Sequence, residues 1–166
     1  MGDRGVAVSV TVRDTDRGLA ARLAALRDLD RWVVVVGVLA DEGARPHEDS
    51  DLTVLDIATI HEFGAPAAGI PQRSFVRATV DEHRADIARI QRALAARVIA
   101  GKLDVRGALE QLGAKVVGMI QTRIAAGIAP PNAPTTVERK GSATPLVDSG
   151  QLRGSVTYAV RARGGA

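Results

Sequence analysis

The sequence predicts an α+β fold in which a small, mostly antiparallel β-sheet packs with several α-helices. Strand-like runs stand near the N-terminus and close to the C-terminus, whereas the middle of the chain has helical periodicity. A short link between the two longest helical segments favours a long antiparallel hairpin. The chain has 166 residues, and domains usually hold about 100–200. We therefore predict a single domain over residues 1–166.

The first part of the chain is expected to form strand, helix, strand and loop. Valines alternate with smaller residues at 6–12, as in a half-buried strand. The run WVVVVGVL at 32–39 is β-branched and predicts a strand that is buried on both faces. The polar stretch 41–51 predicts an exposed loop. Between the strands, an amphipathic helix is expected over 14–27 with three leucines at helical spacing: Leu19, Leu23 and Leu26.

The stretch 52–75, LTVLDIATIHEFGAPAAGIPQRSF, predicts a capped helix followed by an elbow. Thr53 and Asp56 stand in capping-box positions before an apolar run. Gly64 is suited to the left-handed conformation that ends a helix, and Pro66 cannot extend one. The elbow is longer and richer in Gly and Pro than a plain connection requires, so it carries specific structural information.

Two helices are expected to form the hairpin. The longest is predicted over 74–99 and is ended by Gly101. Asp104 is expected to cap the second, which runs to about Ala126. The second helix carries one apolar stripe, formed by Val105, Leu109, Leu112, Val116, Ile120 and Ile124.

The C-terminal part is expected to be irregular before it ends in a strand. The Pro-rich segment 128–145 predicts irregular structure. The segment 155–160 alternates as a strand and is expected to join the sheet of the two N-terminal strands. The tail 161–166, RARGGA, is expected to be loose.

The composition bounds the classes of function. The chain has no cysteine, which excludes disulfides and thiolate metal sites. No apolar run approaches the about 18 residues that span a bilayer, and the N-terminus lacks a signal core. We therefore expect a soluble chain that has no membrane partner and begins in the cytoplasm. The formal net charge of +3 does not by itself indicate nucleic-acid binding.

The quality of the core and the distribution of charge both suggest association. Small aliphatic residues must build the core, because the aromatic residues are only Trp32, Phe63, Phe75 and Tyr158. We expect a modest core whose apolar surface is completed by neighbouring subunits. The segment 41–62 is acidic and 129–166 is basic. Copies of the chain could use this asymmetry to stack head to tail, although a solvated asymmetry also explains it.

No catalytic, cofactor or metal site can be assembled from the sequence. His61 and Glu62 resemble the pair in a zinc-protease helix, but Ala65 stands where the second histidine is needed. Ser149 lacks the strand–turn–helix elbow of a hydrolase nucleophile. There is no phosphate-binding loop and no dinucleotide fingerprint. A small hydrolase that uses His61 and Glu62 stays as an alternative of a different class.

A second alternative is a DNA-binding regulator. Arg139 and Lys140 form a small basic spot in the basic C-terminal region, where they could contact nucleic-acid phosphates. No aromatic side chains stand beside them for base stacking. A solvated pair explains them as well.

Two motifs, in order, carry a resemblance to a known family. IATIHEFGAPAAGIPQRSFVRATVDEH at 57–83 resembles the central signature of small neck and tail proteins of tailed bacteriophages, including Mu-like prophages, where an IA.IHEFG helix leads into an IP.RSF.R elbow. The stretch 105–158 resembles the second half of that family, with its PL.DTG.L..S ending. Ser149 replaces the usual Thr there, and Asn132 stands where Leu is expected. The similarity spans roughly residues 36–160.

The resemblance implies a structural, non-enzymatic virion protein. Members of this family are neck or tail-completion proteins that form rings, commonly sixfold, at the head–tail junction. The implied partners are copies of the chain, the portal-connector complex or its adaptor proteins, the tail tube or terminator protein, and genomic DNA that passes through the lumen. Assembly would occur in the bacterial cytoplasm, and no cofactor is implied. The alternative within this class is a tail terminator ring that caps the tail tube.

Subunit contacts are predicted in the elbow 64–75 and in the segment 129–145. Phe75 fits either an apolar anchor in an interface or an ordinary core residue. The predicted interface residues are His61, Glu62, Phe63, Gly64, Pro71, Arg73, Phe75, Pro130, Pro131, Arg139, Lys140, Asp148 and Leu152.

Overall fold

The computed structural model describes residues 18–46, 51–131 and 150–164. Within them it confirms the α+β class, with helices packed against a two-stranded antiparallel sheet. The strand predicted at 6–12 lies outside the described residues, as do Arg139, Lys140 and Asp148. The elements in chain order are α1 (Leu19–Arg31), β1 (Trp32–Val38), α2 (Ala40–Gly43), α3 (Val54–Phe63), the 3-10 helix η1 (Pro66–Ala68), α4 (Arg77–Glu82), α5 (Arg84–Ile99), α6 (Val105–Ala126), α8 (Gln151–Ser155) and β2 (Val156–Ala162).

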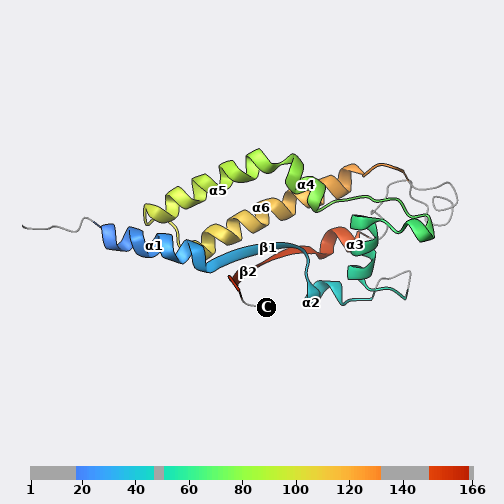
Figure 1. Ribbon diagram of the computed structural model, residues 1–166, viewed down its shortest axis with the longest axis horizontal. Coiled ribbons are helices and arrows are strands. Elements are labelled where there is room, and N and C mark those ends of the chain that lie inside the picture. Colours follow the sequence, from blue (N-terminus) through green and yellow to red (C-terminus); the bar gives the residue numbers. More distant parts are fainter. Residues whose placement is uncertain (1–17, 47–50, 132–149, 165–166) are drawn as a thin grey trace, which may run out of the picture.

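The molecule is elongated, with α6 packed against both the sheet and α5 (Figure 1). The two strands pair in register from Trp32 opposite Ala162 to Val38 opposite Val156. The predicted final strand therefore forms, and its partner is the predicted strand that begins at Trp32. The predicted hairpin also forms, as α5 and α6. No helix among the described residues is long and apolar enough to cross a membrane.

Among the described elements, helices cover the sheet on one face only, which corrects the prediction that the valine run is buried on both faces. Trp32, Val34, Val36 and Val38 pack against the core from alternate positions of β1. The intervening residues Val33 and Val35 point the other way, opposite Arg161 and Ala159 of β2, and are only half-buried. A β-branched run has the same composition whether one face or both are covered, so the sequence alone could not separate these cases.

Gly113 allows α6 to approach the sheet closely. A Cβ at this position would lie 2.6 Å from Tyr158 Cγ and 2.9 Å from Val34 Cγ2, both closer than packed atoms come. At Gly118, one and a half turns further along the same helix, a Cβ would meet nothing within 4 Å. Gly113 and Gly118 therefore have opposite packing environments.

We expect Gly118→Ala to raise the free energy of unfolding by up to about 1 kcal/mol, because alanine has the higher helix propensity. Gly113→Ala is expected to lower it by about 1–2 kcal/mol, since overpacking against Tyr158 outweighs that gain. Urea unfolding of the two variants beside the wild type measures both changes. Stabilisation by Gly113→Ala would contradict the close approach of α6 to the sheet.

Three boundaries differ from the predictions. The helix expected over 74–99 is broken into α4 and α5 at His83, whose φ of −96° and ψ of 15° leave the helical region, so that the longest described helix is α6 with 22 residues. The helix expected to end at 27 continues to Arg31. The described part of the tail is not loose: the strand includes Ala162, and the Arg163 amide donates to the Arg31 carbonyl at 2.7 Å.

The core is built around α6, as its apolar stripe predicted. Val105, Leu112, Val116, Ile120 and Ile124 are buried, and Leu109 is partly buried. The Asp104 side chain makes no capping hydrogen bond, in contrast to the prediction. The three leucines that make α1 amphipathic lie outside this core: no residue of α1 is buried, and only Ala25 and Leu29 pack against the core from this helix.

Candidate functional site: the corner at Glu62 and Arg73

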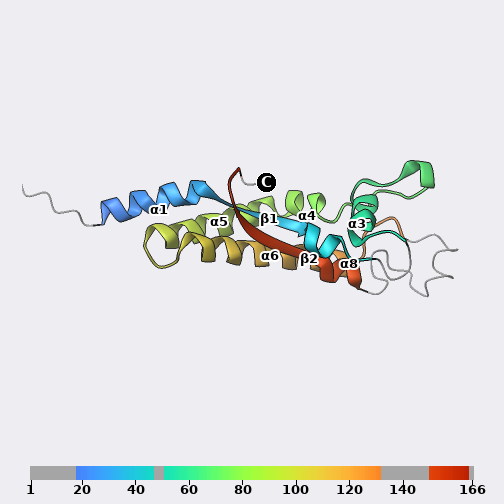
Figure 2. The same ribbon diagram turned by 90° about the horizontal axis from the view of Figure 1, so that it is seen from below.

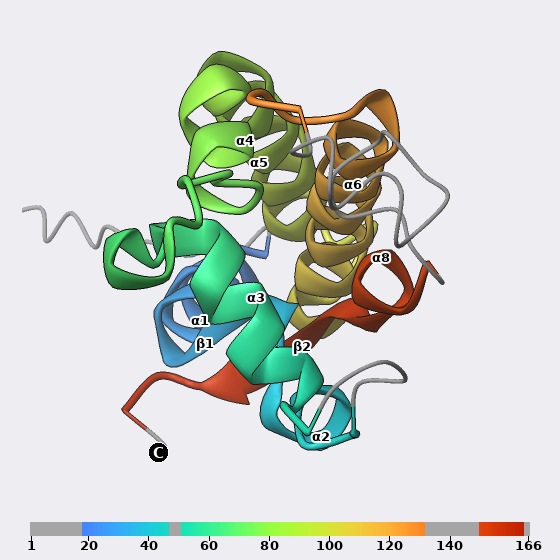
Figure 3. The same cartoon turned by 90° about the vertical axis from the view of Figure 1, so that its right-hand side faces the viewer.

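The stretch 52–75 forms a corner at one end of the molecule, where α3 lies beside α2 and α8 (Figure 3). The predicted capping box begins α3: the Asp56 amide donates to Thr53 Oγ1 at 3.2 Å, and the Thr53 amide donates to Asp56 Oδ2 at 3.0 Å. Two hydrogen bonds lower the pKa of the exposed Asp56. The larger effect comes from the Thr53 hydroxyl and the smaller from the Thr53 amide. This carboxylate therefore stays ionised to lower pH.

Gly64 ends α3 in a conformation that other residues rarely adopt. Its φ is 78° and its ψ is 165°, so the positive φ that the sequence predicted is present but the left-handed helical ψ is not. A Cβ at Gly64 would also lie 3.0 Å from the Gln72 amide nitrogen. Only glycine fits a chain that turns out of α3 and returns so close to its end.

The elbow then closes on itself and returns to α3. Ala65 and Ile70 exchange two backbone hydrogen bonds of 2.9 and 3.0 Å around η1. The Arg73 amide donates to the His61 carbonyl at 2.7 Å, and Gln72 Nε2 donates to the Glu62 carbonyl at 2.9 Å. These donors satisfy carbonyls that the end of a helix leaves without intrahelical partners. The elbow is thus held against the C-terminus of α3.

The Glu62 carboxylate links α3 to the start of α4. Glu62 is only 8% exposed. Its Oε1 accepts from the Ser74 hydroxyl at 2.6 Å and the Arg77 amide at 3.1 Å, and its Oε2 accepts from the Phe75 and Val76 amides, both at 2.9 Å. A carboxylate placed on the amides that open a helix is also favoured by the helix dipole. One side chain therefore occupies the exposed donors of another helix.

Two opposing effects act on the pKa of Glu62. Burial alone would raise it, because the charged form loses water. The hydrogen bond from the Ser74 hydroxyl and those from the amides of Val76, Arg77 and Phe75 together outweigh burial, so the pKa lies below its usual value. The carboxylate is ionised at neutral pH and accepts from four donors.

Arg73 joins the elbow to the segment that follows α6. It is 5% exposed, and burial lowers the pKa of its guanidinium. Its Nε donates to the Pro130 carbonyl at 2.9 Å and its Nη2 to the Pro131 carbonyl at 3.1 Å. A planar guanidinium can bridge two neighbouring carbonyls in this way, whereas an ammonium group has no such fork. The two segments predicted to carry subunit contacts are therefore bonded to each other.

A second arginine supports the same corner from α6. Arg123 Nε donates to the Ser74 carbonyl at 3.4 Å, and its Nη1 forms an ion pair with Glu82 at the end of α4. At the same end of the molecule, Gln151 Nε2 of α8 donates to the Pro46 carbonyl at 2.9 Å. Polar side chains thus connect segments that are far apart in the sequence.

The structure divides the predicted interface residues into three groups. Four of them are buried within the chain, so we place them in internal packing rather than at an interface: Glu62, Arg73, Phe75 and Leu152. Of the two interpretations of Phe75, its exposure of 1% favours an ordinary core residue. Phe63, Pro71, Pro130 and Pro131 are exposed, and their contact with a neighbour stays a prediction. His61 and Gly64 are half-buried in the corner.

The long-range role of Glu62 was missed by the sequence reasoning. The local signal was Ser74, which stands two residues before the N-cap Val76 of α4 and accepts from the Ala78 amide at 3.1 Å. Nothing in the local pattern places an acid of the preceding helix on the amides of Phe75, Val76 and Arg77. That placement depends on how the elbow folds back.

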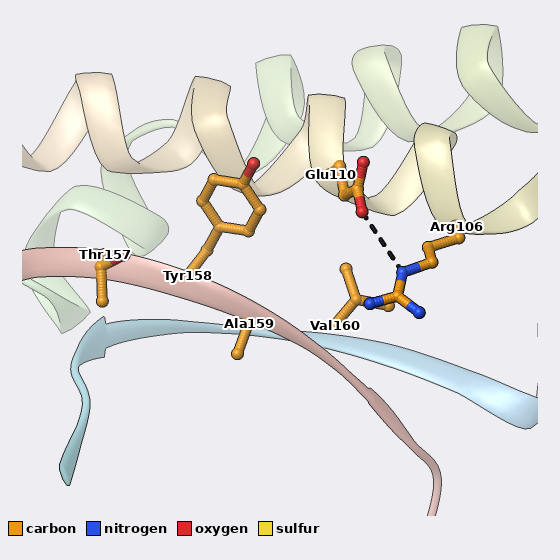
Figure 4. Close-up of a pocket in the computed structure, with 6 residues that line it drawn as sticks. All are labelled: Arg106, Glu110, Thr157, Tyr158, Ala159 and Val160. Carbon is orange, nitrogen blue, oxygen red and sulfur yellow. Dashed lines mark hydrogen bonds and ion pairs between the residues drawn. The ribbon is translucent and has the colours of Figure 1, made fainter. Parts of the chain in front are cut away.

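One depression lies away from the corner, between α6 and β2 (Figure 4). Its volume is about 450 Å³, and it is lined by Arg106, Glu110, Thr157, Tyr158, Ala159 and Val160. The only charged groups in it, Arg106 and Glu110, pair with each other at 3.3 Å on the helix surface. In the part of the chain that the structure describes, no three His, Asp or Glu side chains are grouped to hold a metal ion.

Comparisons of the chain with protein-family models, with curated proteins and with solved structures found no match.

Proposed function

We propose that this chain is a structural subunit of a tailed-bacteriophage neck, a tail-completion protein that forms a ring at the head–tail junction. The ring would connect the portal-connector complex to the tail tube and let DNA pass through its lumen. The observation that carries the proposal is the pair of hydrogen bonds that Arg73 donates to the segment after α6. Through the hydrogen bonds of Arg73 to Pro130 and Pro131, the IHEFG–IPQRSF motif is bonded to the second stretch on which the resemblance rests.

The chemistry of the corner supports a structural role. A hydrolase built on His61 and Glu62 would need the carboxylate to bind a metal or to accept a proton from water. Both oxygens of Glu62 already accept two hydrogen bonds each from the start of α4. Freeing this carboxylate would leave buried amides without acceptors, which costs about 1–3 kcal/mol for each group. Glu62 thus holds α3 against the start of α4.

The surface also supports a subunit that associates. The described part of the chain leaves seven large apolar side chains exposed and covers only one face of its sheet. Scattered apolar side chains are normal on a protein surface, whereas side chains aligned along one face of a helix indicate a contact. A ring subunit of this size would bury such faces against its neighbours.

The test is an in vitro joining assay. A particle-producing strain that lacks the gene for this chain is expected to yield separate heads and tails, and adding the purified chain to that lysate is expected to restore joined particles, counted by electron microscopy. Buffer alone is the control. Joined, infectious particles from the deletion strain would contradict the proposal. In a map of the joined particles, contact with the connector indicates a neck protein, and contact with only the top ring of the tail tube indicates the terminator.

A further inference from the structure

The helix α1 presents an apolar face to solvent. Leu19 is 63% exposed, Leu23 45% and Leu26 47%. Their spacing of four and three residues places them on one side of the helix, while Ala25 and Leu29 pack against the core from a different side. We call Leu19, Leu23 and Leu26 the α1 face.

The helix α3 presents a second apolar face. Phe63 is 65% exposed, Leu55 42% and Leu52, just before the helix, 40%. Val54, Ala58 and Glu62 form the buried stripe of α3. Leu55 lies at the edge of this stripe, close to Gly43 of α2, and Phe63 projects away from it. We call Leu52, Leu55 and Phe63 the α3 face.

The two faces belong to opposite ends of the molecule. Figure 1 shows α1 extending beyond one end of the sheet, whereas α3 lies at the other end, and the view turned by 90° in Figure 2 agrees. The faces are different in sequence and in shape. A contact between one end of a copy and the opposite end of the next would therefore be heterologous, the kind that closes into a ring when the rotation allows it.

The charges around the two faces are complementary. The α1 face is accompanied by more bases than acids: Arg22, Arg27 and Arg31, with Arg161 and Arg163 at the adjacent end of β2, against Asp28 and Asp30. The α3 face is accompanied by more acids than bases: Asp41, Glu42, Asp51 and Asp56 against Arg45. Two α1 faces or two α3 faces brought together would juxtapose like charges, whereas an α1 face and an α3 face would not.

We infer that copies of this chain bind one another head to tail, with the α1 face of one copy seated on the α3 face of the next. The inference rests on the proposed function, because a closed ring is the assembly that this contact would build. It also accounts for an apolar stripe on α1 that the subunit does not bury. The occupant of each face is a second copy of the chain.

Cysteine cross-linking tests the contact directly, because the wild-type chain has no cysteine. Leu26→Cys mixed with Phe63→Cys, treated with a short bis-maleimide, is expected to give a covalent dimer on a denaturing gel, while each variant alone gives little. The double variant is expected to give a ladder that ends at the ring number. Val80→Cys, exposed on α4, is the matched control and is expected not to cross-link with Leu26→Cys.

Mixing of surface variants tests the polarity of the contact. Leu23→Ser/Leu26→Ser and Phe63→Ser are each expected to be monomeric by sedimentation velocity. Their equimolar mixture is expected to form dimers and nothing larger, because one variant keeps an intact α3 face and the other keeps an intact α1 face. Circular dichroism confirms that both variants are folded. Should the wild-type chain assemble only on tails, the same variants and cross-links are examined in joined particles.

The outcomes separate the two proposals. A strong Leu26→Cys homodimer, or unchanged assembly of both serine variants, overturns the head-to-tail contact and leaves the neck function standing. A wild-type chain that shows neither self-association nor cross-links in joined particles also overturns the contact. A chain that never restores the joining of heads and tails overturns the neck function, whichever way its copies associate.

Discussion

Glu62→Gln is expected to lower the free energy of unfolding by about 3 kcal/mol at pH 7. The substitution preserves the shape of the side chain but removes the charge that accepts from the Ser74 hydroxyl and three backbone amides. Hydrogen bonds to a charged group contribute about 1.5–3 kcal/mol. The amide group of glutamine would also direct its own N–H donors at the donors that open α4. Urea unfolding of the two proteins measures the difference.

Glu82→Gln is the matched control, because Glu82 lies in the same corner but its side chain is 61% exposed in its ion pair with Arg123. Exposed ion pairs contribute about 0–1 kcal/mol. A loss of more than about 1 kcal/mol in this control, or a loss in Glu62→Gln no larger than in the control, would contradict the role assigned to Glu62.

The loss caused by Glu62→Gln is also expected to depend on pH. The pKa of Glu62 in the folded chain lies below the value of 4.5 that an unperturbed glutamate has. Such a group stabilises the fold fully above the unfolded value, and the stabilisation is lost as the pH falls through the folded pKa. The difference between the wild type and Glu62→Gln is therefore expected to be constant from pH 6 to 8 and to shrink below about pH 4.5. A difference that grew on acidification would show that the charge is not what stabilises the corner.

The features that the sequence predicted well are those encoded within a few residues. Thr53 and Asp56 cap α3 because each reaches the other across a single turn. The stripe of α6 is buried because all its members lie on one side of one helix. In both cases the nearest neighbours in sequence supply the interaction, so no knowledge of the tertiary structure is required.

The features that the sequence did not predict depend on which surface another segment covers. The leucines of α1 have the spacing of a core-facing stripe, yet the subunit covers the side of the helix that carries Ala25 and Leu29. The valine run of β1 is consistent with burial on one face or on both. The local sequence gives no sign that Glu62 is buried. It is buried because the elbow brings Phe75 and its neighbours back to its carboxylate. Periodicity shows that a face is apolar, but it does not identify what covers it.

Phe75→Ala is expected to lower the free energy of unfolding by about 3–5 kcal/mol, whereas Phe63→Ala is expected to change it by less than about 0.5 kcal/mol. Phe75 is 1% exposed and Phe63 is 65% exposed, so only the first substitution leaves a cavity in the folded chain. Both lie in the motif on which the resemblance rests, and they form a matched pair of identical substitutions. Unfolding is measured at a chain concentration low enough for monomers to dominate, because association would add to the apparent stability.

The same pair separates folding from assembly. Phe63→Ala is expected to weaken self-association of the chain, measured by sedimentation velocity across a range of concentrations, while its monomer unfolds like the wild type. An exposed aromatic side chain at the centre of a contact commonly contributes 2 kcal/mol or more to binding, which corresponds to about a thirtyfold weaker association. If Phe63→Ala instead destabilised the monomer as Phe75→Ala does, Phe63 would be covered by its own chain, and the α3 face could not be the surface that receives a second copy.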